Sequence, residues 1–313
     1  MTAPGEPESG HARGNVLTVG TFDGVHRGHH LVLSRLAARG RESGLRSMLV
    51  TFAPHPLEVV NPAAAPPLLT AGDEKLEMLV ESQLDSVVVL PFTPVLARYD
   101  AEQFVTEILL RQLDMRELLI GYDHGFGRGR AGDVELLQTL GRRIDFAVSV
   151  VPPVQARDGR PISSTSIRRA VAGGDLARAA DGLGRLYSVS GVVVRGAARG
   201  RGLGYRTINL APISPRKLLP PEGVYAVRVL IAGGLYGGML NLGPRPTFGE
   251  TAVTIEAHLF DAVGDFYGAR VRVEFVARLR ETRAFPNPGE LVAQLAQDEQ
   301  MARLMIGRSR AGL

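Results

Sequence analysis

The chain has 313 residues and a formal net charge of +4, with 45% hydrophobic and 22% charged residues. This composition is typical of globular proteins, and the length suits two domains that each bury a core. The absence of cysteine excludes disulfides and thiolate metal sites. No apolar run is long enough to span a membrane, and residues 1–14 lack the apolar core of a signal peptide. We therefore expect a cytoplasmic protein with a disordered lead-in over residues 1–14.

Arginine supplies almost all of the positive charge, and the only lysines are Lys75 and Lys217. Arginine binds phosphate groups through two parallel hydrogen bonds. A nucleic-acid-binding protein is expected to have a basic stripe interleaved with aromatic residues. This sequence has no such stripe and no tryptophan. We expect anionic small molecules as partners, with neither nucleic acid nor membrane. The sequence leaves the oligomeric state open.

Residues 16–31 predict a short buried strand, a glycine-containing turn and an amphipathic helix. A helix N-terminus carries unpaired N–H groups and binds anions. His26 and His29 are three positions apart, so both imidazoles lie on one side of the first helical turn, and Gly28 leaves room for a phosphate. Imidazoles and a helix dipole suit the stabilisation of a phosphoryl group during nucleotidyl transfer. The alternative is a pair of polar loop histidines without a chemical role.

The sequence GTFDGVHRGH, residues 20–29, resembles the HxGH-type motif of nucleotidylyltransferases. Its form, GxFDGxHxGH, is similar to that of the bifunctional prokaryotic riboflavin kinase/FMN adenylyltransferase family, the FAD synthetases. The resemblance implies that His26 and His29 act catalytically on the α-phosphate of ATP. It also implies that Gly20, Phe22 and Gly28 belong to the ATP site.

Residues 47–52 predict a second buried strand that leads into a loop where His55 lies between two prolines. The sequence TFAPHP resembles the family's TFxPHP, which implies that His55 binds the flavin. The alternative is a histidine that only caps a rigid exit loop. The loop lies at the carboxyl end of a strand, where doubly wound sheets bind ligands.

Strands and helices alternate through the rest of the first half. The apolar run at residues 87–90 predicts a parallel strand covered on both faces, and residues 101–112 predict a helix. Further strands are expected at residues 118–121 and 146–151. The alternation predicts an N-terminal doubly wound, Rossmann-like α/β domain.

A glycine-rich, basic loop with two aromatic residues occupies residues 121–133. It resembles the family's GxDFRFG segment, which implies that Asp123 and Phe126 contact the flavin and nucleotide. His124 and Gly125 stand where the family commonly has Phe-Arg. Without the resemblance, the same loop indicates only a mobile glycine segment.

The sequence PISSTSIRR at residues 161–169 places hydroxyls directly before a helix, with Arg168 one turn later. Ser164 or Thr165 can cap that helix, and the exposed N–H groups with Arg168 make a second phosphate site. Capping alone is the alternative. The segment resembles the family's xSSTxIR, which implies that Ser164, Thr165 and Arg168 hold the β- and γ-phosphates of ATP.

The periodicity changes after short helices over residues 165–186, so we divide the chain into domains 15–184 and 185–313. Short strands then follow in series, and five or six of them predict a small antiparallel barrel. They span residues 187–194, 223–229, 236–242, 254–259 and 271–276. An amphipathic helix closes the chain over residues 288–303, with four apolar residues on its inner face. These are Leu291, Leu295, Met301 and Leu304.

The segment from Gly196 to Asn209 is glycine-rich, and glycines let a backbone wrap phosphates. It resembles the kinase loop GxxxGRxLGxPTAN, which implies phosphate contacts from Gly196 and from three further residues. These are Gly200, Arg201 and Gly204. Thr207 and Asn209 are two apart on an extended segment, so both can reach Mg²⁺, which prefers oxygen ligands. Arg206 and Ile208 replace the family's proline and alanine.

Three more residues of the second half match family positions. Glu256 in TIEAHLFD matches a strand glutamate and is implied to be the general base for a ribityl hydroxyl. Without the resemblance it is an outward-facing strand residue. Asn241 opens a segment that resembles the family's NxGxxPTF turn near the adenine. Arg278 resembles the family's flavin-side arginine.

The leading hypothesis is a two-domain enzyme of FAD biosynthesis. Its riboflavin kinase-like barrel phosphorylates riboflavin to FMN, and its α/β domain adenylylates FMN to FAD with release of pyrophosphate. The implied ligands are ATP, Mg²⁺, riboflavin, FMN and FAD. An alternative keeps the adenylyltransferase but has a degenerate or altered-substrate barrel. A third hypothesis is a basic RNA-binding or flavin-sensing protein, which predicts salt-dependent RNA binding and no pyrophosphate release.

Overall fold

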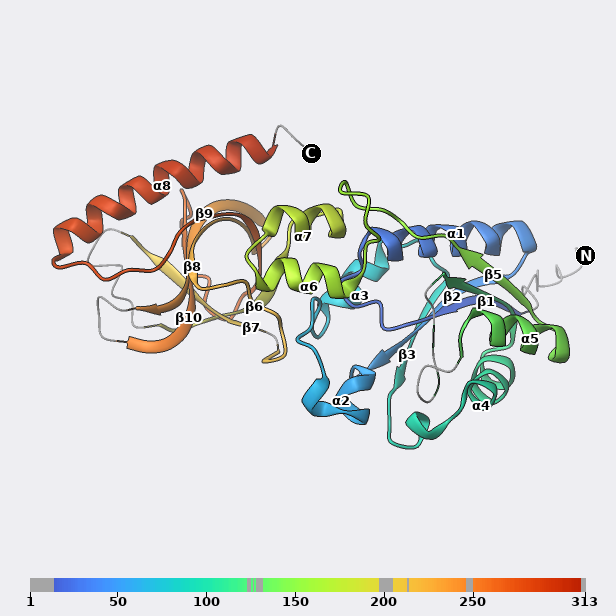
Figure 1. Cartoon of the computed structure of the whole chain (residues 1–313). Coiled ribbons are helices and arrows are strands. Elements are labelled where there is room, and N and C mark those ends of the chain that lie inside the picture. Colours follow the sequence, from blue (N-terminus) through green and yellow to red (C-terminus); the bar gives the residue numbers. More distant parts are fainter. Residues whose placement is uncertain are drawn as a thin grey trace, which may run out of the picture. The chain divides into compact units, whose positions relative to one another are not determined.

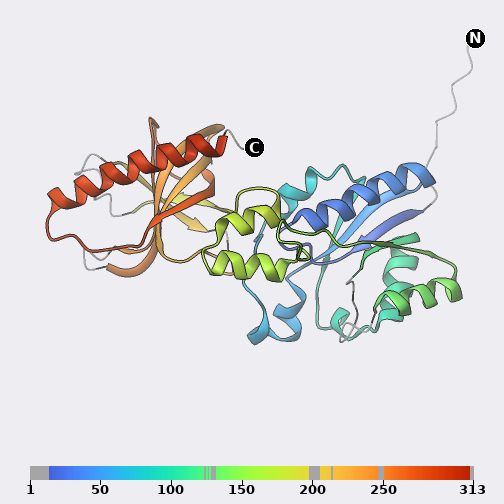
Figure 2. The same cartoon turned by 45° about the horizontal axis from the view of Figure 1, so that its top comes forward.

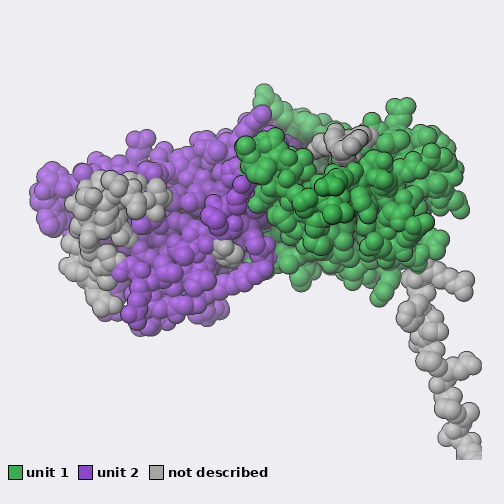
Figure 3. Space-filling view, turned by 90° about the horizontal axis from the view of Figure 1, so that it is seen from below, with its two compact units in different colours: residues 1–66, 75–155, 159–161 green, residues 67–74, 156–158, 162–313 purple. Residues whose placement is uncertain are grey.

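The computed structural model describes residues 14–122, 125, 127, 132–196, 205–212, 214–245 and 250–310. The predicted disordered lead-in thus falls almost wholly outside the described residues. The chain forms two compact units (Figures 1 and 3). Unit 1 contains residues 1–66, 75–155 and 159–161, and unit 2 contains residues 67–74, 156–158 and 162–313. Residues 162–184, which we assigned from the sequence to the first domain, cluster with unit 2 by their contacts.

Unit 1 is built on a five-stranded parallel sheet in the order β3-β2-β1-β4-β5. Its strands are β1 (Asn15–Val19), β2 (Arg46–Ala53), β3 (Ser86–Pro91), β4 (Met115–Gly121) and β5 (Ala147–Val151). The first strand lies in the centre, and the chain winds outward from it in both directions. This order confirms the predicted doubly wound, Rossmann-like architecture.

Helices cover both faces of this sheet (Figure 2). The helical elements along this part of the chain are α1 (Arg27–Ser43), α2 (Pro56–Val60), η1 (Pro62–Ala64), α3 (Glu74–Val80), η2 (Leu96–Arg98), α4 (Ala101–Gln103), η3 (Phe104–Gln112) and α5 (Val134–Ile144). Successive residues of a strand face opposite sides, so Val16 of β1 packs against Leu36 of α1, while Leu17 packs in the core that contains Leu109 of η3. The central strand is therefore buried on both faces.

The prediction that residues 87–90 are covered on both faces is wrong. The strand is parallel, but β3 lies at the edge of the sheet, and the side chain of Val89 is 38% exposed. A continuous apolar run therefore does not distinguish a central from an edge strand here.

Unit 2 contains a closed antiparallel barrel with the strand order β10-β7-β6-β11-β8-β9, which confirms the predicted small barrel. Its strands are β6 (Ser188–Val194), β7 (Thr207–Pro212), β8 (Gly223–Ile231), β9 (Gly234–Arg245), β10 (Glu250–Leu259) and β11 (Arg270–Arg280). Closure pairs every strand with two neighbours.

The terminal helix α8 (Pro288–Arg310) lies against the outside of the barrel. Its buried residues include Ala302 and Ile306, which pack with Ala226 and Met239 of the barrel. The predicted inner residues Met301 and Leu304 are 45% and 48% exposed, so that part of the prediction is wrong. The face of α8 that packs on the barrel includes the buried Asp298 instead. A carboxylate oxygen of Asp298 lies 2.7 Å from a guanidinium nitrogen of Arg280 on β11, which neutralises its charge.

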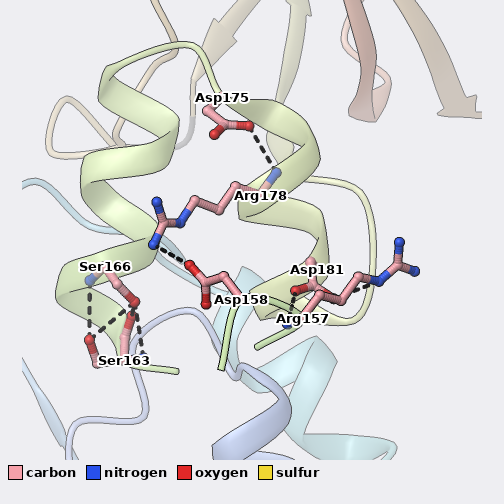
Figure 4. Close-up of polar contacts among 7 residues, drawn as sticks. All are labelled: Arg157, Asp158, Ser163, Ser166, Asp175, Arg178 and Asp181. Atoms are coloured by element: carbon pink, nitrogen blue, oxygen red, sulfur yellow. Dashed lines mark hydrogen bonds and ion pairs between the residues drawn. The ribbon is translucent and has the colours of Figure 1, made fainter. Parts of the chain in front are cut away.

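Helices α6 (Ser164–Ala172) and α7 (Leu176–Leu183) also belong to unit 2. Figure 4 shows why residues 156–158 join them: Arg157 pairs with Asp181 at 3.3 Å, and Asp158 pairs with Arg178 at 2.9 Å. Residues 67–74 belong to unit 2 because Leu68 forms a parallel bridge with Lys217.

Candidate active sites

The turn between β1 and α1 holds the two predicted catalytic histidines of unit 1. His26 is the N-cap of α1, and its Nδ1 accepts a hydrogen bond from the backbone N–H of His29 at 3.3 Å. In return, the Nδ1 of His29 accepts from the backbone N–H of His26 at 3.3 Å. The two rings stack with centroids 3.6 Å apart and an interplanar angle of 15°. The structure thus brings His26 and His29 together on the first turn.

This reciprocal cap sets the tautomer of both rings. A ring nitrogen that accepts a hydrogen bond carries no proton, so each neutral imidazole carries its proton on Nε2. An Nε2–H group is a donor suited to a phosphate oxygen. The cap therefore fixes the orientation of two donors next to a helix N-terminus, where anions bind.

Phe22 and the neighbouring glycines shape the same turn. Phe22 is 4% exposed, and the centroid of its ring lies 4.5 Å from that of the His29 ring. A Cβ atom on Gly20 would lie 2.9 Å from the Phe22 ring, so this close approach requires glycine. Gly28 is the second residue of α1. These contacts show Phe22 supporting His29, and a direct contact of Phe22 with ATP stays a prediction.

His55 is the N-cap of α2. The Nδ1 atom of its ring accepts from the backbone N–H of Leu57 at 3.2 Å, and the backbone N–H of His55 donates to the carboxylate of Glu58 at 3.2 Å. These contacts agree with the capping interpretation of His55. A flavin contact is compatible with them and stays a prediction.

The start of α6 differs from the expected cap. Ser163 is the N-cap, with extended backbone angles, and its Oγ accepts from the N–H of Ser166 at 3.1 Å. Ser164 and Thr165 already lie in the helix, so the prediction that one of them caps it is wrong. Both belong to the first turn, where N–H groups lack partners within the helix. Sequence reasoning missed Ser163, because Ser166 stands three residues later where the capping-box signature has Glu or Gln.

Arg168 follows one turn into α6, and its Nε donates to the carbonyl oxygen of Pro67 at 3.1 Å. This hydrogen bond holds the Nε end of the Arg168 guanidinium against the segment 67–74 of unit 2. The predicted phosphate residues Ser164, Thr165 and Arg168 therefore share one short helix segment in unit 2. His26 and His29 belong to unit 1.

Three predicted residues of the barrel form a row across neighbouring strands. Glu256 of β10 is directly paired with Asn209 of β7 on one side and with Asn241 of β9 on the other. Directly opposed residues of antiparallel strands project from the same face. Thr207 of β7 joins the row, because its Oγ1 donates to Oε1 of Glu256 at 2.5 Å. The sequence did not reveal this register, since the four residues come from three separate motifs.

The row lies on the outer face of the barrel. On β9, Asn241 shares its face with Met239, which packs against α8 on the outside. Leu240 and Leu242 project to the opposite face and are almost fully buried. The barrel interior is thus packed with apolar side chains, and the polar row is on the exterior.

Gly196 lies against the same row. A Cβ atom at this position would lie 2.1 Å from Nδ2 of Asn209, so any side chain would displace the amide. The predicted phosphate residues Gly200, Arg201 and Gly204 lie outside the described residues, as do the predicted flavin residues Asp123 and Phe126 of unit 1.

Arg278 lies on β11, and one of its terminal nitrogens donates to the carbonyl oxygen of Glu222 at 2.6 Å. A Cβ atom on Gly223 would lie 2.8 Å from Nε of Arg278. The side chain is therefore held at the beginning of β8, and its flavin contact stays a prediction.

Among the described residues, no group of three or more His, Cys, Asp or Glu side chains could hold a metal ion. Thr207, Asn209 and Glu256 nevertheless place a hydroxyl, an amide and a carboxylate side by side. Oxygen donors of this kind fit Mg²⁺, which usually retains several water ligands. In the described part of the chain, no helix is long and apolar enough to cross a membrane.

The α/β unit with a histidine-capped turn and the barrel with an Asn-Glu-Asn row define an enzyme that transfers phosphorus-containing groups. The family model described as FAD synthetase matches residues 8–166, and the model described as riboflavin kinase matches residues 183–306. The bifunctional riboflavin kinase/FMN adenylyltransferase of Escherichia coli K12 is 39% identical over 298 residues, covering 95% of this chain and 94% of that protein. The Pseudomonas fluorescens protein of the same name is 37% identical with the same coverage.

A solved structure described as a macrolide-efflux protein from Streptococcus pneumoniae superimposes with a TM-score of 0.81 at 30% identity. It covers 96% of this chain and 95% of its own chain. The chain belongs to the bifunctional riboflavin kinase/FMN adenylyltransferase family. It is an enzyme of FAD biosynthesis with both activities, which confirms the leading hypothesis.

Proposed function

We propose that the outer row of the barrel carries riboflavin phosphorylation. The observation that supports this assignment is the register that joins Asn209, Glu256 and Asn241, with Thr207 bonded to the carboxylate. Glu256 accepts the proton of the ribityl hydroxyl as that oxygen attacks the γ-phosphorus of ATP. The bond between the γ-phosphorus and the bridging oxygen breaks, and ADP leaves with FMN as product.

Thr207 and Asn209 would hold Mg²⁺ in this proposal, because a hydroxyl and an amide oxygen suit a hard cation. Bound there, the ion would neutralise charge on the ATP phosphates. We assign phosphate contacts to Gly196, Gly200, Arg201 and Gly204, as the family resemblance implies. Asn241 contacts ATP, and Arg278 binds the flavin.

In unit 1, His26 and His29 donate from Nε2 to the α-phosphate of a second ATP. A phosphate oxygen of FMN attacks the α-phosphorus, the bond to the bridging oxygen breaks, and pyrophosphate leaves with FAD as product. Gly20, Phe22 and Gly28 shape the ATP site of unit 1. In unit 2, Ser164, Thr165 and Arg168 at the start of α6 are assigned to phosphate binding, as the family resemblance implies. His55, Asp123 and Phe126 contact the flavin.

Arg206, which replaces the family's proline, is the basis for the alternative of a degenerate or altered-substrate barrel. Its carbonyl oxygen lies 2.7 Å from Nδ1 of His258, and His258 is paired with Thr207 across the strands. A side-chain hydrogen bond thus restrains the backbone that proline would otherwise stiffen. This contact supports an active kinase site.

The deciding experiment incubates the full chain with ATP, Mg²⁺ and either riboflavin or FMN, and follows FMN and FAD by chromatography. Conversion of riboflavin to FMN and onward to FAD is expected. If FMN is converted to FAD but riboflavin is left unchanged, the alternative of an adenylyltransferase with a degenerate or altered-substrate barrel is supported. We place both reactions in the cytoplasm, with ATP and flavins as sufficient partners and no requirement for nucleic acid.

A further inference from the structure

Lys75, the second residue of α3, donates from one nitrogen to three acceptors in unit 1. These are the carbonyl oxygen of Thr21 at 3.3 Å, Oγ1 of Thr51 at 3.1 Å and the carbonyl oxygen of Phe52 at 3.1 Å. An ammonium group has three N–H donors, so all of them are directed at the protein. Oγ1 of Thr51 also donates to the carbonyl oxygen of Thr21, at 3.2 Å. The Thr21 carbonyl therefore accepts two hydrogen bonds, one from Lys75 and one from Thr51.

The Thr21 carbonyl belongs to the peptide that precedes Phe22. Phe22 has a φ angle of +49°, a left-handed conformation that is unfavourable for a residue with a side chain. Hydrogen bonds to the preceding carbonyl restrain this peptide, and the Phe22 ring then packs on the ring of His29. A continuous path of contacts thus runs from Lys75 to a histidine of the reciprocal cap.

The charge of Lys75 is balanced locally. Burial lowers the pKa of Lys75, and the negative charge of Asp23 opposes that shift. Asp23 is itself buried, two residues after Thr21 in the same turn. The ammonium therefore has a counter-charge within the segment that it holds.

An arginine at position 75 could not make the same three hydrogen bonds. The chain uses arginine for nearly every basic residue and has only two lysines, Lys75 and Lys217. A guanidinium is a flat fork whose N–H groups start from three nitrogens, so it does not direct three bonds from one point. The three acceptors around Lys75 converge on a single atom.

We propose that Lys75 is a positioning residue for adenylyl transfer, which fixes the Thr21–Phe22 peptide and, through the Phe22 ring, the orientation of His29. The inference rests on the proposed role of His29. Lys75 contacts no reacting group and acts only by orienting the donor on His29.

The test compares Lys75→Met and Lys75→Arg in the full chain, with riboflavin phosphorylation as the internal control for folding. For Lys75→Met we expect kcat of FAD formation to fall by about 10- to 100-fold, because small displacements of a catalytic group cost that much. The KM for FMN and the rate of FMN formation should change by less than about threefold. Lys75→Arg keeps the charge without the three-point geometry, so its kcat should stay well below that of the wild type.

The pH profile gives a readout that a purely structural residue would not move. Lysine loses a proton, and one of its three donors, as the pH rises, and burial brings this loss to a lower pH than usual. We expect an alkaline decline in kcat of FAD formation in the wild type that is missing in Lys75→Met and shifted to higher pH in Lys75→Arg.

Thr51 supplies a second pair of variants should Lys75→Met fail to fold. Thr51→Val removes the acceptor for Lys75 and the donor to Thr21, and it should also lower kcat. Thr51→Ser keeps both and should retain activity. If His29→Asn abolishes FAD formation while Lys75→Met and Thr51→Val stay within about threefold of the wild type, the role of Lys75 is refuted. If His29→Asn leaves FAD formation intact, the proposed catalytic role of His29, on which the role of Lys75 rests, fails instead.

Discussion

The ammonium of Lys217 lies 2.7 Å from a carboxylate oxygen of Glu74, and the two side chains are 2% and 1% exposed. The pair joins segments 143 residues apart within unit 2. The other carboxylate oxygen of Glu74 accepts from the N–H of Ser190 at 2.6 Å, and Lys217 also donates to the carbonyl oxygen of Leu69 at 2.6 Å. The pair therefore fastens the segment 67–74 to the barrel.

Lys217→Met is expected to destabilise unit 2 by about 3–5 kcal/mol, because it leaves the buried carboxylate of Glu74 without its counter-charge. Urea unfolding monitored by circular dichroism and by loss of kinase activity measures the effect. The double variant Glu74→Leu/Lys217→Met removes both charges and should be less destabilised than the single variant. Additive losses in the double variant would show that the pair is not energetically coupled.

Glu256→Gln is expected to lower kcat of FMN formation by about 10²- to 10⁴-fold, since the amide cannot take the hydroxyl proton. FAD formation from supplied FMN should be unchanged. Glu81→Gln, the same substitution at an exposed residue of unit 1, serves as the matched control. Near-normal FMN formation in Glu256→Gln would remove Glu256 from its role as base.

Thr207→Val tests the hydroxyl that bonds to Glu256 at 2.5 Å. We expect a higher Mg²⁺ requirement and about a tenfold or greater loss of kcat for FMN formation, because a metal ligand and a carboxylate partner are lost together. Thr207→Ser keeps the hydroxyl and should recover most of the activity. Equal activity of the valine and serine variants would contradict the assignment.

The sequence predicted the sheet, the barrel and the histidine pair because each depends on local patterns. The spacing of His26 and His29 alone places them on one helical turn, and the alternating strands of the second half indicate a barrel. The reciprocal cap was not predictable, since it needs the χ angles of both rings.

Other features depend on partners that are distant in the chain. The exposure of Val89 follows from the edge position of β3, and the burial of Asp298 follows from its ion pair with Arg280. The row of Asn209, Glu256 and Asn241 depends on strand register across the barrel. Sequence periodicity carries no information on which strand lies next to which.

Gly196→Ala is expected to reduce FMN formation strongly, because the new Cβ would lie 2.1 Å from Nδ2 of Asn209 and would displace it. FAD formation from FMN should be unaffected. Gly307→Ala is the control: apart from its chain neighbours and the adjacent helix backbone, no atom lies within 4 Å of the added Cβ, and in helix α8 alanine is expected to stabilise by about 0.5–1 kcal/mol. Full kinase activity in Gly196→Ala would exclude Asn209 from the site.

Ser163→Ala separates capping from phosphate binding at α6. Loss of the Oγ acceptor for the N–H of Ser166 should cost about 0.5–2 kcal/mol of stability. Thr165→Ala removes no cap, so its unfolding should stay within about 0.5 kcal/mol of the wild type while the KM for ATP in FAD formation rises. The reverse pattern, with Thr165→Ala destabilised and kinetically normal, would contradict the phosphate role of this turn.

Asp85 and Ser47 provide a pH-dependent contribution to stability at the edge of the sheet. Oδ2 of Asp85 accepts two hydrogen bonds from Ser47, one from Oγ at 2.6 Å and one from the backbone N–H at 2.7 Å. These hydrogen bonds lower the pKa of Asp85. A lowered pKa means that the stabilisation is complete above the unfolded-state pKa and is lost as the pH falls through the folded-state pKa.

Asp85→Asn should therefore lower the stability of unit 1 at neutral pH by about 0.5–1 kcal/mol, a modest value because Asp85 is exposed to solvent. The difference between variant and wild type should shrink as the wild-type carboxylate becomes protonated in acid. Thermal unfolding at a series of pH values between neutral and strongly acidic measures this convergence. A difference that stays constant over the whole range would show that charge on Asp85 does not hold β3 to β2.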